Sequence, residues 1–77
     1  MGKEIAIQEL SELVDELVRN PKSLLGTMEL KGFLGELPYG TIPNEVLDEL
    51  QDKLGKVNPR AAMLLLDYSV GQVVSMQ

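Results

Sequence analysis

Hydrophobic residues recur at helical spacing along the first part of the chain. Apolar side chains between positions 5 and 18 follow one face at three- and four-residue intervals, and acidic side chains occupy the opposite face. Arg19 follows in the last turn, where a cation suits the helix dipole. Pro21 stops the helix because proline lacks the backbone N–H donor. The pattern predicts an amphipathic helix over residues 5–18.

The dipeptide Asn20-Pro21 predicts the start of a second helix, with asparagine as the N-cap and proline at the first helical position. An apolar stripe of Leu24, Leu25 and Met28 follows. The glycines at positions 26, 32 and 35 each lower helix stability by about 1 kcal/mol relative to alanine. We therefore expect a short or interrupted helix, with residues 32–40 largely irregular.

A turn at residues 37–40 divides the chain into two halves. Its sequence is Leu-Pro-Tyr-Gly, in which proline presets the first central position and glycine tolerates positive φ. A third helix opens at residues 41–43, and Gly55 is expected to follow its last turn as the C′ residue. Its apolar stripe consists of Val46, Leu47, Leu50 and Leu54.

A fourth helix is predicted from Asn58-Pro59, which repeats the Asn-Pro start of the second. Residues 61–66 are apolar nearly all round, which is typical of a helix buried in a core. Residues 69–74 are rich in β-branched side chains and are interrupted by glycine. This tail is either a frayed helix or a short extended segment.

The two halves of the chain share a pattern. Residues 12–17 (Glu-Leu-Val-Asp-Glu-Leu) precede Asn20-Pro21-Lys22, and residues 45–50 (Glu-Val-Leu-Asp-Glu-Leu) precede Asn58-Pro59-Arg60. The pattern indicates two similar helical hairpins, although acidic amphipathic helices also resemble one another by chance. Two units are fewer than the three or more repeats that a solenoid needs, so a closed arrangement is favoured.

We predict an all-α fold, a small bundle of three to four helices. The alternative is an α-helical chain that ends in a short extended segment. The residues expected in the core are Leu10, Val14, Leu17, Leu50, Leu54, Leu64 and Leu65.

The size of the chain limits its stability. Its 77 residues are assigned to one domain, 1–77, and a domain of this size buries only about 60% of the surface that its unfolded chain exposes. Small domains compensate with disulfides, structural metals or oligomers, but the chain contains no cysteine and no histidine. Self-association is the remaining aid, and we expect no cofactor and no metal site.

Net charge and hydropathy narrow the range of partners. The formal net charge is −5, which opposes binding to the phosphate backbone of nucleic acids. A helix-turn-helix interpretation fails because the would-be recognition helix carries Glu45, Asp48, Glu49 and Asp52. The longest apolar run, residues 61–66, is far below the ~20 residues of a membrane helix, and no secretory leader is visible. We expect no direct nucleic-acid partner, no membrane partner and a cytoplasmic location.

The sequence offers little for catalysis, and we predict no enzyme and no catalytic residue. The acidic ridges could supply oxygen ligands to Ca²⁺ or Mg²⁺, but a solvated helix face explains them without a metal. Asp67, beside Tyr68 and Ser69 in the most apolar helix, is the one carboxyl whose pKa burial could raise. An outward-facing Asp67 is the alternative.

Residues 67–70, Asp-Tyr-Ser-Val, faintly resemble the Asp-Ser-Leu attachment site of acyl carrier proteins. In that family the aspartate and the serine are adjacent and open a helix in mid-chain, whereas here Tyr68 separates them. The resemblance implies a carrier function. Because of this departure, a carrier protein ranks third among the expected functions, together with an enzyme.

The function expected first is protein–protein association, beginning with a homodimer that buries the apolar faces of the second and fourth segments. The alternative is an acidic effector that occupies a basic site on another protein, which requires both acidic ridges on one continuous surface. Apolar residues at positions 33–42 form either a core plug or a contact surface. The candidate partner-binding residues are Leu25, Met28, Phe33, Leu34, Leu37, Tyr39, Ile42, Met63, Val70 and Val73.

Overall fold

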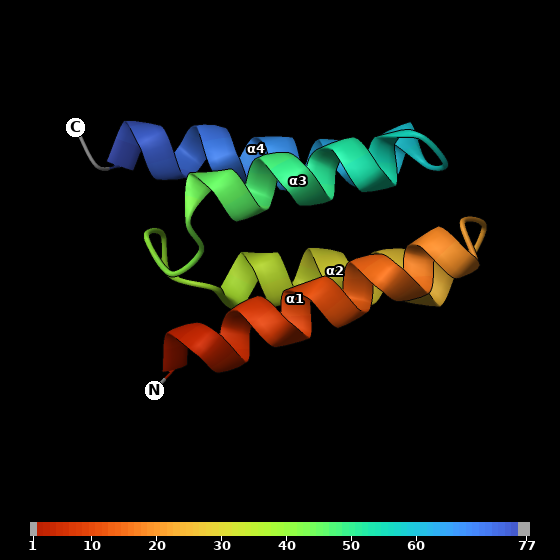
Figure 1. The fold of residues 1–77 in the computed structure, drawn as a ribbon, viewed down its shortest axis with the longest axis horizontal. Helices are drawn as coiled ribbons and strands as arrows, with labels where there is room; N and C mark the ends of the chain where they lie inside the picture. Colours follow the sequence, from red (N-terminus) through yellow and green to blue (C-terminus); the bar gives the residue numbers. More distant parts are fainter. Residues whose placement is uncertain (1, 76–77) are drawn as a thin grey trace.

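The computed structural model describes residues 2–75 as four helices joined by short connections (Figure 1). They are α1 (Gly2–Arg19), α2 (Leu24–Glu36), α3 (Asn44–Gly55) and α4 (Pro59–Ser75). The all-α prediction is confirmed, and residues 2–75 contain no strand. Because α4 continues to Ser75, an extended segment is wrong for residues 69–75; residues 76–77 lie outside the described part.

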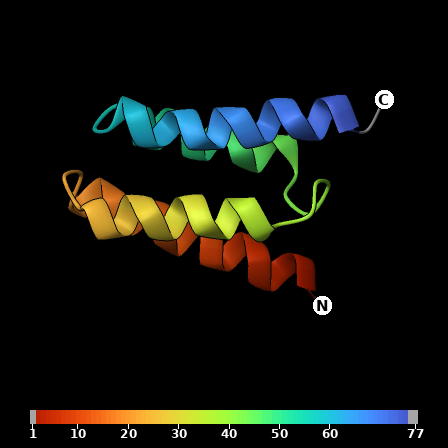
Figure 2. The same cartoon turned by 180° about the vertical axis from the view of Figure 1, so that it is seen from behind.

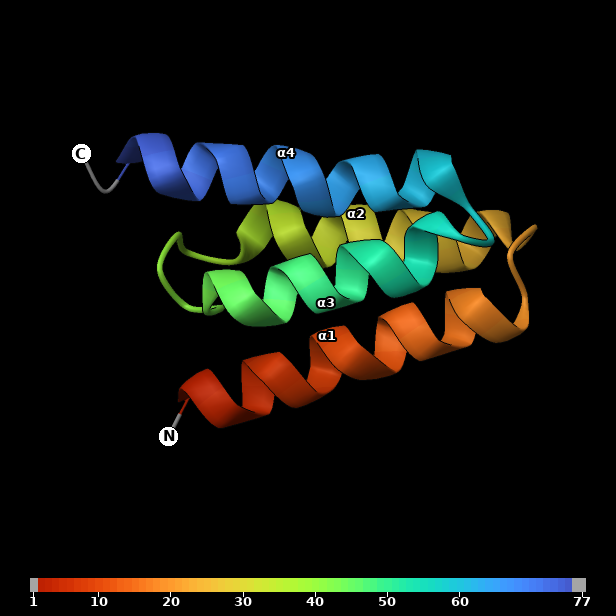
Figure 3. The same cartoon turned by 45° about the horizontal axis from the view of Figure 1, so that its top comes forward.

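The helices form two antiparallel hairpins, α1–α2 and α3–α4, packed into a four-helix bundle. Helix α1 lies beside α3 and runs in the same direction, with α2 and α4 behind them (Figures 1 and 3). Helices α2 and α4 are also neighbours, as the view from behind shows (Figure 2). The connection from α2 to α3 therefore crosses the diagonal of the bundle.

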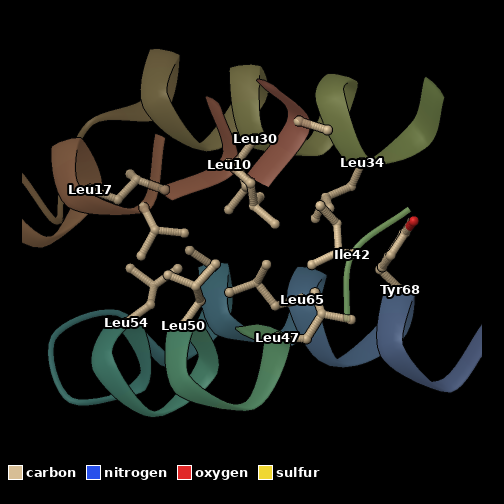
Figure 4. Packing of buried hydrophobic residues seen from close by; sticks show 13 residues of the cluster. Leu10, Leu17, Leu30, Leu34, Ile42, Leu47, Leu50, Leu54, Leu65 and Tyr68 are labelled. Carbon is tan, nitrogen blue, oxygen red and sulfur yellow. The ribbon is translucent and has the colours of Figure 1, made fainter. Parts of the chain in front are cut away.

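The core lies between the two hairpins and receives side chains from all four helices (Figure 4). Of the seven predicted core residues six are buried, whereas Leu64 is only partly buried. Each fully buried leucine contributes about 2–3 kcal/mol relative to an exposed one. Seven further residues that the list of expected core residues did not name are also buried, namely Ala6, Leu30, Leu34, Ile42, Leu47, Ala61 and Tyr68.

Helix α2 begins later than predicted. Its N-cap is Ser23, whose side-chain oxygen accepts a hydrogen bond from the Gly26 N–H (2.9 Å). Asn20 and Pro21 belong instead to the turn that precedes it, where the Ser23 N–H donates to the Asn20 carbonyl. The N-cap prediction for Asn20 is wrong because a serine three residues later caps the free N–H groups.

Helix α2 also continues to Glu36, so the prediction that residues 32–40 are largely irregular is wrong. Leu30 and Leu34 lie one turn apart on the buried face. Their burial, about 2–3 kcal/mol each, exceeds the helix penalty of Gly32 and Gly35, about 1 kcal/mol each. Between α2 and α3 only residues 37–43 are outside a helix.

The second Asn-Pro corner is confirmed as a helix start. Asn58 caps α4 by accepting a hydrogen bond from the Ala61 N–H through Oδ1 (3.1 Å). Its Nδ2 donates to the carbonyl oxygen of Pro21 (2.8 Å). The two corners therefore differ in local structure but meet at one end of the bundle, where this bond joins the hairpins.

The two glycines assigned special roles on either side of the third helix differ. Gly40, in the connection before α3, has a φ of 93°. It is the third residue of the turn that the Thr41 N–H closes on the Pro38 carbonyl (3.3 Å), one residue later than the predicted turn at residues 37–40. Gly55 is the last residue of α3 and has no positive φ, so its assignment as a C′ residue is wrong. The cap residue that follows, Lys56, has an ordinary right-handed helical conformation.

The crossing connection is held onto α4 by one buried polar side chain, Gln72, which is 2% exposed. Its Oε1 accepts a hydrogen bond from the Gly40 N–H (2.8 Å). Its Nε2 donates to the Ile42 carbonyl (2.8 Å) and to Asn44 Oδ1 (2.9 Å). Gln72 thereby satisfies backbone groups that the connection could not otherwise bury without loss of stability.

Two tyrosines complete this attachment. The Tyr68 hydroxyl donates to the Pro38 carbonyl (2.7 Å), and the Tyr68 and Tyr39 rings pack with centroids 5.2 Å apart. Tyr39 also lies over Gly71, where a Cβ atom would overlap its hydroxyl. Gly71 thus lets the connection approach α4 closely.

Replacing Gln72 by leucine is expected to lower the free energy of unfolding by about 2–4 kcal/mol, because the polar groups of the connection lose their partners. The matched control is Gln8→Leu at an exposed position of α1, where we expect the free energy of unfolding to change by no more than about 0.5 kcal/mol. Urea denaturation followed by circular dichroism measures both. Equal effects of the two substitutions would contradict the role assigned to Gln72.

Burial, together with the nearby Tyr39, raises the pKa of Tyr68 above its ordinary value near 10. Because folding favours the protonated phenol, its stabilising contribution is complete below about pH 10 and is lost as pH rises through the folded-state pKa. The chain has two tyrosines and no tryptophan. In the Tyr39→Phe variant Tyr68 is the single tyrosine, and its tyrosinate absorbance should titrate at higher pH in the folded protein than in the urea-unfolded chain. Equal midpoints in the two states would refute the assignment.

Candidate protein-binding surfaces

Helix α4 carries a row of apolar side chains on the side turned away from the core. Met63, Leu66, Val70 and Val73 follow at intervals of three, four and three residues and are 40–55% exposed. We call these four residues the α4 stripe. Such spacing places side chains in one line along a helix and is the seam pattern of coiled coils. The stripe includes three of the predicted partner-binding residues, Met63, Val70 and Val73.

A smaller apolar patch lies at the start of α2. Leu24, Leu25 and Met28 are 68–80% exposed. Leu25 and Met28 are predicted partner-binding residues, and the structure places both on the surface. The patch covers little more than one helical turn, so it is shorter than the α4 stripe.

The predicted residues between positions 33 and 42 do not form one surface. Leu34 and Ile42 are buried in the core, so a partner cannot reach them and the core-plug alternative describes them. Phe33 and Leu37 are partly buried against the core. Tyr39 is half exposed, but its ring packs on Tyr68. Leu34 is buried because it lies on the core-facing side of α2, and Ile42 is buried because the connection packs against α4.

The list of candidate partner-binding residues omitted Leu24 in the α2 patch and Leu66 in the α4 stripe, and also Val74 near the end of α4, all of which are exposed. The signal for Leu66 was present, since positions 63, 66, 70 and 73 already show the stripe spacing. This spacing does not stand out in the sequence because neighbouring positions are also apolar.

The acidic helices α1 and α3 lie side by side. Lys53 of α3 forms an ion pair with Asp15 of α1, and Lys56 lies 3.6 Å from Asp52 within α3. These side chains are about half exposed or more, so the pairs add little stability. Most remaining carboxylates of both helices are exposed.

The residues considered for chemistry lie apart from any buried site. Asp67 is exposed, so it lacks the burial on which the catalytic alternative depends. The hydroxyl of its neighbour Tyr68 is bonded to the crossing connection. Within residues 2–75 no three acidic side chains converge closely enough to hold a metal ion. None of the helices described is both long and apolar enough to cross a membrane.

Comparison with protein-family models, with curated proteins and with solved structures finds no match to this chain.

Proposed function

We propose that the protein is a non-catalytic association module of the cytoplasm that pairs with a second copy of itself through the α4 stripe. The observation that supports this proposal is the line of four exposed apolar side chains on α4. Removing such side chains from water contributes about 25 cal/mol per Å². In a two-fold dimer both copies present the same stripe, so each residue contributes twice.

The distribution of charge favours α4 as the meeting surface. Asp67 is the one charged residue between positions 61 and 75, although the whole chain has a net charge of −5. Two copies therefore repel each other least when their α4 helices meet. Association also stabilises a domain of this size by mass action, since the dimer contains only folded chains.

Placing a charge in the stripe tests the proposal. Val70→Glu is expected to weaken dimerisation at least about hundredfold, because each copy would bury an unpaired carboxylate. Val70 is 55% exposed, so the monomer should remain folded, which circular dichroism would verify. Sedimentation equilibrium over a wide concentration range measures the dissociation constant.

Met28→Glu is the matched control, because it adds the same charge to the exposed patch on α2. We expect Met28→Glu to change the dissociation constant of the dimer by no more than about threefold, because the added charge lies outside the interface. A strictly monomeric wild-type protein contradicts it. A larger loss with Met28→Glu than with Val70→Glu would place the interface on α2.

A second candidate function, an acidic effector for a basic site on another protein, has one specific observation in its favour. Helices α1 and α3 are adjacent and carry most of the acidic residues, so the two ridges can form one continuous surface. A salt titration separates the candidates. A charge-driven complex should weaken strongly from about 50 mM to about 500 mM salt, whereas the affinity of the apolar α4 dimer should not fall.

A further inference from the structure

A groove with a volume of about 950 Å³ runs between α1 and α2, on the side of α1 away from α4. Leu13 of α1 and Phe33 of α2 line it, and both are partly buried hydrophobic residues packed against the core. The groove therefore offers an apolar surface that the fold leaves partly open.

Carboxylates surround this apolar surface. Glu9, Glu12, Asp15 and Glu16 line it from α1, and Glu29 and Glu36 from α2, whereas Arg19 is the one cation in the lining. Asp15 is paired with Lys53, but the other five have no salt-bridge partner within residues 2–75. The excess of negative charge around the groove favours the approach of a cationic ligand.

Gly32 leaves the groove open on the α2 side. It lies within α2, lines the groove and has no positive φ, and nothing lies within 4 Å of a Cβ built on it. Alanine would therefore fit and would stabilise the helix by about 1 kcal/mol. The fold does not require a glycine at Gly32, and the missing side chain leaves room there for the backbone of a bound segment.

The spacing of the carboxylates matches a helical ligand. Glu9 and Glu16 are seven residues apart, as are Glu29 and Glu36. Each pair therefore spans about 10.5 Å along its helix, two helical turns. A ligand helix that repeats cations every seven residues would face both pairs, with its apolar side chains on Leu13 and Phe33.

From these observations we propose that the α1–α2 groove binds a cationic amphipathic helix of a partner protein. The charge of the lining excludes nucleic acid by repulsion, and it opposes a second copy because the amphipathic helices α1 and α3 are acidic. The apolar floor favours an amphipathic helix over a small polyamine. The inference is independent of the α4 stripe, which lies on another helix.

A synthetic peptide tests the groove with the full-length protein. The probe is a fluorescently labelled helix of about 14 residues, or four turns, with leucines on one face and lysines on the other. The control peptide has the same composition in scrambled order. Fluorescence anisotropy should show binding of the amphipathic peptide at least about tenfold tighter than of the scrambled one.

Matched variants locate the site. The double variant Glu12→Lys/Glu29→Lys should weaken peptide binding at least about tenfold, because it places repulsive charges on both walls. Glu45→Lys/Glu49→Lys makes the same change in net charge on α3, outside the groove. It should change the peptide affinity by no more than about threefold. Gly32→Leu, which fills the groove without altering charge, should also weaken binding about tenfold or more.

Several outcomes would overturn the inference. Equal losses in the two charge-reversal variants would mean that only net charge attracts the peptide, and a larger loss on α3 would place binding on the α1–α3 face. Three other results would show that the groove does not bind an amphipathic helix. They are an unchanged peptide affinity of Gly32→Leu, equal binding of the scrambled peptide, and displacement of the peptide by spermine at equal concentration. The affinity of the same peptide for Val70→Glu shows whether peptide binding depends on the α4 stripe, and the inference expects it to be unchanged.

Discussion

The hydrogen bonds of Gln72 fix the arrangement of the whole bundle. The connection between α2 and α3 crosses the bundle diagonally, and Gln72 bonds to it at Gly40 and Ile42 and to Asn44 at the start of α3. Tyr68 adds a bond to Pro38. Because the connection crosses, α3 returns beside α1, and α4 lies beside α2. A connection along one side would give other neighbours, so this network determines which surfaces meet.

The neighbours that follow from this crossing divide the surface by chemistry. The acidic amphipathic helices lie together on one side, whereas α4 carries a single charge along residues 61–75. The groove beside α1 combines both kinds of residue, with an apolar floor and acidic walls. A chain of 77 residues thus presents an acidic side, an apolar stripe and a groove that combines both kinds of residue.

Much of the fold could be predicted from the sequence, because amphipathic periodicity and the Asn58-Pro59 start are local signals. Local signals failed where tertiary contacts decide. Burial of Leu30 and Leu34 stabilises α2 through its two central glycines. The cap of α2, Ser23 and not Asn20, was decided by a local hydrogen bond. Gln72 could not be singled out, since its partners lie about 30 residues away and a glutamine at that position has no distinctive pattern. The groove depends on the pairing of α1 with α2, which no single helix reveals.

The central claim is that copies of this protein meet through α4 and not through their acidic helices. Methyl NMR spectra recorded along a dilution series test it most directly. The account predicts that the methyl signals of Met63, Leu66, Val70 and Val73 shift with concentration, while those of Ile7 and Val46 on the acidic helices stay constant. Shifts confined to α1 and α3, or no shifts on α4 at millimolar concentration, would contradict it.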